Sequence, residues 1–270
     1  MIFDRLRKPG KGKAVSDYNR DEGPMETEPW CDLHSHFLPG IDDGCRTVEE
    51  SVKLLRYAGD HGIAGMVATP HYYPEQPIES FIEKRNAASE SLKKALKDLE
   101  EVNGQEIKVP VWCLGAEVAY YEGISSAAGI ERLTMGDSGY LLLELPFNGW
   151  NNSILRDIYT LINILNITPI LAHLERYIDI ADERILEQLY DLDLLIQMNG
   201  GYIINRTRDA KRRIRDGHVN VLGSDTHNMT SRIPNLDQAV YILSTSGMDG
   251  EKEQLRSNNL EIFRRAAGIN

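Results

Sequence analysis

Apolar and polar positions follow two different periods along most of the chain. Seven short, mainly apolar runs are separated by longer stretches in which apolar residues recur every three or four positions. The runs are WCDLH (30–34), AGMVATP (64–70), VPVWCLGAE (109–117), YLLLELP (140–146), TPILAH (168–173), LLIQMNG (194–200) and VNVLGSD (219–225). Strand-length runs that alternate with helical stretches predict a parallel sheet.

The stretches between the runs predict the helices. Thr47 begins the first, because a threonine followed three residues later by Glu50 forms a capping box. The expected helices span 47–61, 80–99, 154–166, 183–190, 207–216, 235–244 and 251–267. Seven strand–helix units without a break in composition predict one α/β barrel domain over 29–270, with a doubly wound open sheet as the alternative.

Residues 1–28 differ from the rest. They are polar, rich in charge, glycine and proline, and lack an apolar period, which predicts a flexible N-terminal extension. The basic residues of this segment suggest either a solvated arm or an electrostatic tether to a membrane surface or an acidic partner. They are Arg5, Arg7, Lys8, Lys11 and Lys13.

Composition narrows the function. The 270 residues include 41 acidic and 30 basic side chains, a net charge of −11, which argues against nucleic acid as a partner. Cys31, Cys45 and Cys113 are too few for a disulfide framework and favour a reducing compartment. Without a signal peptide or an apolar run of bilayer length, the chain is expected to be cytoplasmic and not integral to a membrane.

Metal-ligand residue types follow the carboxyl ends of nearly all the predicted strands. In a parallel barrel these ends form one face, where active sites are built. Glu144 lies inside the apolar run LLLELP, and a carboxylate buried in a strand requires a partner. The full set is His34, His36, His71, Glu117, Glu144, His173, Asp225 and His227.

The local spacing of these residues fits chelation. Residues two apart on a strand point to the same side, so His34 with His36 and Asp225 with His227 are expected to form two chelating pairs. Asp43 is the preferred further ligand, while Asp42 could serve instead or both could be turn residues. A set of mixed imidazoles and carboxylates suits Mn, Fe, Zn or Co, and so many ligands imply two or three ions. Any single histidine could instead be an ordinary core or surface residue.

Other polar and aromatic residues suggest how a substrate would bind. Arg176 and Arg232 lie a few residues after predicted ligands and match the geometry of a phosphate, with surface salt bridges as the alternative. Gln197 and Asn199 are either site residues or capping residues. A basic cluster over 206–215 is either a solvated helix face or a means of steering an acidic substrate. The aromatic residues beside the ligands could flank an aromatic substrate or pack internally; they are Phe37, Tyr72 and Tyr73.

The sequence lacks the motifs of covalent phosphoryl or acyl transfer. No cysteine is followed six residues later by arginine, and neither a G-x-x-x-x-G-K-S/T loop nor a G-x-S-x-G elbow occurs. A metal-bridged hydroxide is therefore the expected attacking group.

Several segments together resemble the polymerase-and-histidinol-phosphatase (PHP) superfamily, and within it the bacterial tyrosine-protein phosphatases of capsule and exopolysaccharide operons. These segments are DLHSHFLPGIDDG, ATPHYYPE, GAEV, LLELP, AHLERY, QMNGGY and GSDTHN. The resemblance covers about residues 30–245. It implies a (β/α)7 PHP-type distorted TIM-like barrel with up to three metal ions, usually manganese.

The resemblance also implies a substrate and a role for each site residue. The substrate would be phosphotyrosine on the C-terminal tail of a partner tyrosine kinase that regulates polysaccharide export, and Arg176 and Arg232 would hold the phosphate. The implied metal ligands are His34, His36, Asp43, His71, Glu117, Glu144, His173, Asp225 and His227.

Two other functions fit the same residues. One is a PHP phosphatase or phosphodiesterase acting on a small phosphoester such as histidinol phosphate. The other is a non-catalytic, metal-stabilised scaffold that binds a kinase or an export component. The sequence leaves the oligomeric state open, a homo-oligomer included.

Overall fold

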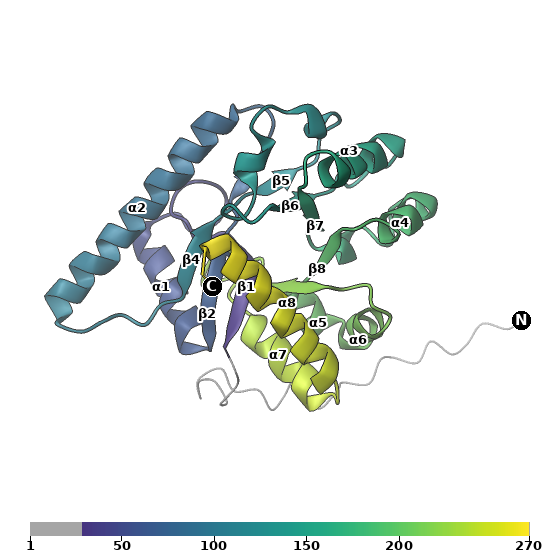
Figure 1. Cartoon of the computed structure of the whole chain (residues 1–270). Helices are drawn as coiled ribbons and strands as arrows, with labels where there is room; N and C mark the ends of the chain where they lie inside the picture. The colour runs from purple at the N-terminus through teal and green to yellow at the C-terminus, as the bar shows by residue number, and fades with distance from the viewer. Residues whose placement is uncertain (1–28, 270) are drawn as a thin grey trace, which may run out of the picture.

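The computed structural model describes residues 29–269, in which parallel strands curl into a barrel surrounded by helices (Figure 1). The predicted extension over 1–28 lies outside the described residues. The strands are β1 (Trp30–Ser35), β2 (Ile63–Ala68), β3 (His71–Tyr72), β4 (Val111–Leu114), β5 (Glu117–Ala119), β6 (Tyr140–Glu144), β7 (Thr168–Leu171), β8 (Leu195–Asn199) and β9 (Val221–Gly223).

Two of the seven predicted strands are each interrupted once. The strand order is β1-β2-β4 in one sheet and β3-β5-β6-β7-β8-β9 in the other, with every pair parallel. The interruption after β2 falls at Pro70, which has no backbone N–H to donate to a ladder. Gly115 N still donates to Ala68 O at 2.8 Å, and Glu117 N donates to Pro70 O at 3.1 Å. The two sheets therefore continue into each other as seven strands.

The first strand and the segment after the last strand are joined by backbone hydrogen bonds. His36 N donates to Thr226 O and Asp225 N donates to His34 O, both at 2.8 Å, and Ser35 pairs with Thr226 in a parallel bridge. The barrel expected from the alternating pattern is confirmed, and an open doubly wound sheet does not fit these contacts.

All seven predicted helices are present, with shifts of a few residues at their ends. Gly200–Asn205 was not predicted as a helix, because it is short and begins with two glycines. Among the described helices none could cross a membrane: even α2, the longest, is charged along its length. The helices are α1 (Val48–Asp60), α2 (Ile78–Asn103), α3 (Asn152–Asn163), α4 (Glu183–Tyr190), α5 (Gly200–Asn205), α6 (Thr207–Arg215), α7 (Leu236–Thr245) and α8 (Asp249–Ala267), and three short 3-10 helices are η2 (Ile124–Ser126), η3 (Ile130–Leu133) and η4 (Leu174–Arg176).

The cap of α1 differs slightly from the predicted capping box. Thr47 Oγ1 accepts a hydrogen bond from Glu50 N at 3.3 Å, as expected. The Glu50 carboxylate, however, accepts from Arg46 N at 2.8 Å instead of returning to the N–H of Thr47. Both bonds satisfy donors at the start of the helix, so the helix begins where the sequence places it.

Apolar side chains fill the amino-terminal end of the barrel, which we call the floor. α8 lies across β1 in Figure 1 and packs against β1, β2, β4 and β9. Its Phe263 comes so close to β2 that a Cβ on Gly65 would lie 2.5 Å from the ring, which explains the glycine. The buried cluster of this end comprises Cys31, Leu33, Val67, Met135, Leu142, Ile170, Ala172, Val221, Ile262, Phe263 and Ala266.

Asn259 of α8 joins the first and last strands where they do not pair directly. Its Nδ2 donates to Cys31 O and to Leu222 O, both at 2.8 Å, and its Oδ1 accepts from Leu222 N at 3.0 Å. The side chain is fully buried. Burying an amide among apolar side chains costs free energy unless its polar atoms are paired, and these three hydrogen bonds pair them.

Candidate metal centre

The carboxyl-terminal end of the barrel brings together the nine residues that the sequence named as candidate ligands. They fall into four groups whose ligand atoms lie within 4.8 Å of one another. The groups are His36, Asp43, His71 and His227; His34, Glu117 and His173; His34, His36 and Asp225; and His71, Glu117 and Glu144. Several residues occur in more than one group, so the groups form one continuous cluster.

Glu117, at the start of β5, lies in the middle of this cluster. Its Oε2 is 3.1 Å from His71 Nδ1 and 3.2 Å from both His34 Nε2 and His36 Nε2. Its Oε1 accepts a hydrogen bond from His173 Nε2 at 2.7 Å. One buried carboxylate is thus faced by imidazoles from β1, β3 and the end of β7.

Three buried polar atoms of the cluster have no hydrogen-bond partner, despite these short distances. They are His71 Nδ1, Glu117 Oε2 and His227 Nε2. Leaving a buried polar atom unpaired is costly. Adjacent ligands of an octahedral ion bound at about 2.1 Å lie about 3 Å apart, which is the spacing around Glu117. The orphaned atoms and the oxygen and nitrogen donor set therefore fit divalent cations.

Hydrogen bonds around the cluster set which imidazole nitrogen faces it. Nδ1–H of His34 donates to Gln197 Oε1 at 3.1 Å, and Nδ1–H of His36 donates to Asp42 Oδ2 at 2.7 Å. Nδ1–H of His227 donates to its neighbour's backbone, Asp225 O, at 3.0 Å. In each case Nε2 is left to face the centre, as in the outer shells of metal sites.

The two adjacent aspartates of PGIDDG take different places. Asp42 accepts hydrogen bonds from His36 Nδ1, Gly44 N and His71 N, so its carboxylate orients neighbouring residues and belongs to none of the ligand groups. Asp43 is 64% exposed and points its Oδ1 to within 3.4 Å of His71 Nε2 and 3.2 Å of His227 Nε2. Asp43 is therefore the one that joins a ligand group, at the mouth of the barrel.

Backbone conformation positions two of the candidate ligands. Among residues 29–269 only three non-glycine residues have positive φ, and they include His173 (φ 34°) and Asp225 (φ 54°). Such a conformation costs free energy and commonly occurs at functional sites. At Asp225 this conformation departs from the simple strand geometry expected for Asp225 and His227, which occur in different ligand groups although His227 Nδ1 and Asp225 Oδ1 lie 3.7 Å apart. His34 and His36 do share a group, with their Nε2 atoms 3.1 Å apart.

The carboxylates also shift the ionisation of His34 and His36. Burial lowers the pKa of His36, but the hydrogen bond to Asp42 and the nearby carboxylate of Glu117 outweigh it and raise the pKa to about 10. His34 is also buried, and the nearby charges of Glu117 and Asp225 raise its pKa. In this arrangement protons on the imidazoles balance the carboxylates, and a divalent cation would displace them.

Arg176 and Arg232 border the centre, where the sequence placed them. Arg232 Nη2 donates to Asp225 Oδ1 at 2.6 Å, and Arg176 Nη2 donates to the other oxygen, Asp225 Oδ2. Burial opposes ionisation of Asp225, but His34 and the two guanidinium groups outweigh it and lower the pKa below its usual range. Both guanidinium groups are about one-third exposed, so a phosphate could reach them.

Three further residues position the ligand cluster; the sequence left the roles of two of them open and did not indicate the third. Gln197 and Asn199 are site residues: Gln197 orients His34, and Asn199 Nδ2 donates to Asp225 Oδ2 at 2.9 Å. Asp32, buried in β1, accepts from His34 N and Ser224 N and so ties β1 to the end of β9. Like Glu144, Asp32 is a carboxylate within an apolar run, and the same signal would have identified it.

The aromatic residues near the ligands divide by exposure. Phe37 and Tyr72 are buried in the core, so packing is their role. Tyr73 is exposed and stacks on His71 with 5.6 Å between ring centroids. The exposed Phe147 contacts Tyr177, which in turn lies beside His173. Two exposed rings therefore lie near the candidate ligands.

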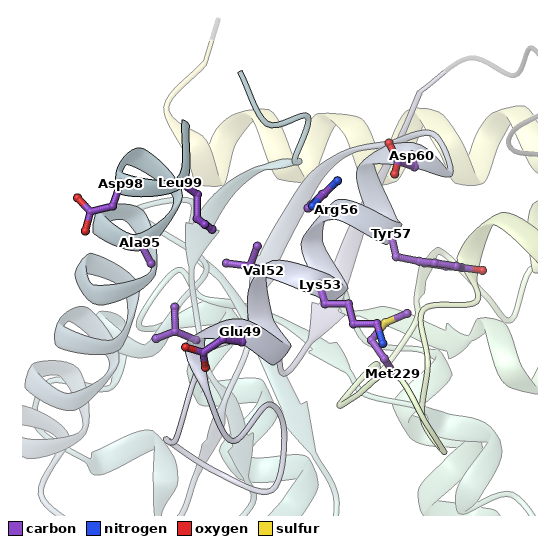
Figure 2. A pocket seen from close by; sticks show the side chains of 11 residues that line it. Glu49, Val52, Lys53, Arg56, Tyr57, Asp60, Ala95, Asp98, Leu99 and Met229 are labelled. Atoms are coloured by element: carbon purple, nitrogen blue, oxygen red, sulfur yellow. The ribbon is translucent and has the colours of Figure 1, made fainter. Parts of the chain in front are cut away.

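A pocket lies between α1 and α2, apart from the ligand cluster (Figure 2). It has a volume of about 660 Å³, and Val52, Leu99 and Met229 give it an apolar lining with charged residues at its edges. None of the nine candidate ligands lines it.

Comparison with known proteins agrees with this arrangement. Residues 30–264 match the family model described as "Capsular polysaccharide synthesis, CpsB/CapC". The chain is 31% identical over 255 residues to the tyrosine-protein phosphatase CpsB of Streptococcus pneumoniae, covering 86% of this chain and 97% of the relative. It is 27% identical over 247 residues to the tyrosine-protein phosphatase YwqE of Bacillus subtilis, covering 87% and 91%.

A solved structure has the same fold. It comes from crystal structures of YwqE of B. subtilis and CpsB of S. pneumoniae, described as unique metal-dependent tyrosine phosphatases. The superposition gives a TM-score of 0.73 at 22% identity and covers 87% of this chain and 94% of the other. At this identity the match establishes the fold.

Proposed function

The chain belongs to the CpsB/CapC family of capsular polysaccharide synthesis, and on this premise we propose that it is a metal-dependent tyrosine-protein phosphatase. The observation that carries the proposal is the cluster at the carboxyl end of the barrel. There, buried imidazoles and carboxylates with orphaned atoms lie beside two arginines suited to phosphate. The substrate is phosphotyrosine on a partner tyrosine kinase that regulates capsule or exopolysaccharide synthesis.

The proposed cofactor is two or three divalent ions, with manganese the first choice and iron, zinc or cobalt the alternatives. The four overlapping ligand groups offer neighbouring positions for these ions: around Asp43 and His227, around His173, around Asp225 and around Glu144. All nine candidate residues take part as ligands in this proposal. Bound ions would ionise a water near neutral pH and neutralise phosphoryl oxygens.

The residues of the chain itself bind and orient the substrate. When substrate binds, Arg176 and Arg232 give up their hydrogen bonds to Asp225 and donate to non-bridging oxygens of the phosphate instead. The phosphorus then lies next to the ligand cluster. Asp42 and Gln197 hold His36 and His34 in the tautomer that presents Nε2. A water oxygen attacks the phosphorus on the side opposite the tyrosyl oxygen, so the new P–O bond forms as the bond to the tyrosyl oxygen breaks.

The exposed rings support an aromatic substrate. Tyr73 stacks on His71, and Phe147 contacts Tyr177 beside His173, so both exposed rings lie near the centre and can contact the ring of a phosphotyrosine. We further propose that residues 29–270 act as one domain, and that the enzyme works in the cytoplasm, where its three free cysteines stay reduced.

The test is an assay on metal-stripped protein reloaded with Mn, Fe, Zn or Co in turn, against a phosphotyrosine peptide and histidinol phosphate. We expect no turnover without metal, recovery with manganese, and higher kcat/KM on the peptide. Faster hydrolysis of histidinol phosphate would favour the small-phosphoester alternative. Metal binding without hydrolysis of either compound would favour the scaffold.

A further inference from the structure

A groove of about 630 Å³ leads away from the metal centre. Asp225, Arg176 and Arg232 line its inner part. From there it runs along α5, past Tyr202 and Asn205 to Arg206, and its other wall is the segment after β9 together with α7. The groove thus joins the proposed phosphate position to a cationic residue outside the ligand cluster.

Arg206 has no carboxylate partner among residues 29–269. It is exposed, and no carboxylate oxygen lies within ion-pair distance of it. Asp209, one turn further along, already accepts from Tyr202 Oη at 2.7 Å and from Arg213 Nε at 2.6 Å, and it pairs with Arg212 as well. The charge of Arg206 is therefore available to a ligand in the groove.

The spacing between Arg206 and the metal centre suits a peptide. Asn199 holds the start of α5 at the centre through its 2.9 Å bond to Asp225. A helix rises about 1.5 Å per residue, so Arg206 lies about 10 Å further along the chain. An extended peptide covers this distance in about three residues, at about 3.3 Å each.

The groove also has a net positive charge. Its arginines are Arg176, Arg206 and Arg232, and its acidic residues are Asp225 and Glu175. Asp225 is held by two of the arginines, and Glu175 accepts from Asn199 N at 3.0 Å beneath the surface of the groove. Arg206 is thus the exposed charge at the outer end, and an anion would be attracted to it.

From this geometry we infer that Arg206 forms an accessory anion subsite, which binds a carboxylate or phosphate about three residues from the phosphotyrosine being hydrolysed. The inference rests on the proposed phosphatase function. An arginine and an anion at such a partly exposed site form a charge-assisted pair weakened by solvent. It should therefore lower KM more than it changes kcat, and its effect should fade as ionic strength rises.

The test compares kcat/KM of the manganese-loaded enzyme on phosphotyrosine peptides that carry alanine, glutamate or a second phosphotyrosine three residues away. Aryl phosphate without a peptide is the reference substrate. Arg206→Gln should lose about two- to fivefold in kcat/KM on the anionic peptides, chiefly through KM, and keep its rate on the alanine peptide and the aryl phosphate. The two anionic arms separate a carboxylate from a phosphate as the preferred group.

Arg208→Gln is the matched control, because Arg208 is also exposed and does not line the groove. Equal losses in the two variants, or no preference of the wild type for anionic peptides, would overturn the subsite. If the wild type hydrolyses neither peptide nor aryl phosphate, the proposed function itself fails and the subsite fails with it. Loss on the anionic peptides alone supports both.

Discussion

The two ends of the barrel differ in whether their buried polar atoms have hydrogen-bond partners. At the floor, Asn259 is fully buried and makes three hydrogen bonds that join β1 to β9 beside the packed ring of Phe263. At the carboxyl end, His71, Glu117 and His227 leave buried atoms without a partner. An unpaired buried polar atom costs about 1–3 kcal/mol, so the carboxyl end is stable only with protons or cations in it.

The contrast separates stability from catalysis in the chain. The floor contributes packing and satisfied hydrogen bonds, whereas the carboxyl end contributes charge that requires a ligand. Substitutions at the two ends should therefore have different effects. A substitution in the floor should destabilise the protein and leave the activity of folded molecules intact. A substitution at the carboxyl end should abolish activity and leave the protein folded.

The largest effect is expected from Glu117→Gln. The carboxylate of Glu117 faces four imidazoles and takes part in two ligand groups, so an amide should weaken ion binding throughout the cluster. We expect kcat/KM on a phosphotyrosine peptide to fall at least about a thousandfold. Removing metal from the wild type with a chelator should lower its kcat/KM to the same residual value. Circular dichroism should show a folded chain; activity within tenfold of the wild type would remove Glu117 from the centre.

Phe263→Ala should act in the other direction. The ring is buried against Gly65, and its loss leaves a cavity in the floor. We expect a loss of about 3–5 kcal/mol in the free energy of unfolding, measured by denaturant titration, and an unchanged kcat below the melting transition. Phe147→Ala removes an exposed ring and should cost less than about 0.5 kcal/mol. Equal costs for the two would show that the floor is not the stabilising end.

Asp42→Asn is expected to have a smaller effect. Asp42 orients His36 but belongs to no ligand group, so an amide should weaken metal binding about 10- to 100-fold without abolishing it. Excess manganese should restore activity, which calorimetric titration and the assay can follow together. Asp60→Asn, at an exposed position on α1, is the control. A variant that excess metal cannot rescue would make Asp42 itself a ligand, in place of Asp43.

Much of the barrel could be predicted because its two periods are strong in the sequence. Parallel topology then placed His34, His71 and His173 together, since strands of a parallel barrel end on one face. Their roles as ligands stay predictions. Helix α5 was not predicted because six residues beginning with two glycines carry no helical period.

Orientation could not be predicted from spacing. Whether Asp42 or Asp43 faces the ligand groups depends on hydrogen bonds to His36 and to the backbone of His71, which are 6 and 29 residues away from Asp42. Asp225 and His227 appeared to be a strand pair, but Asp225 has a left-handed backbone and the two residues occur in different ligand groups. Long-range contacts and local φ values decide such details, and a pattern of residue types contains neither.

Metal content per chain tests the central claim most directly. Stripped protein would be reloaded with manganese, freed of excess ion and measured by mass spectrometry, in parallel with its hydrolysis of a phosphotyrosine peptide. A multinuclear centre predicts two or three ions per chain and a rate that rises with occupancy. One ion or fewer per fully active chain, or undiminished activity of the stripped protein, would contradict it.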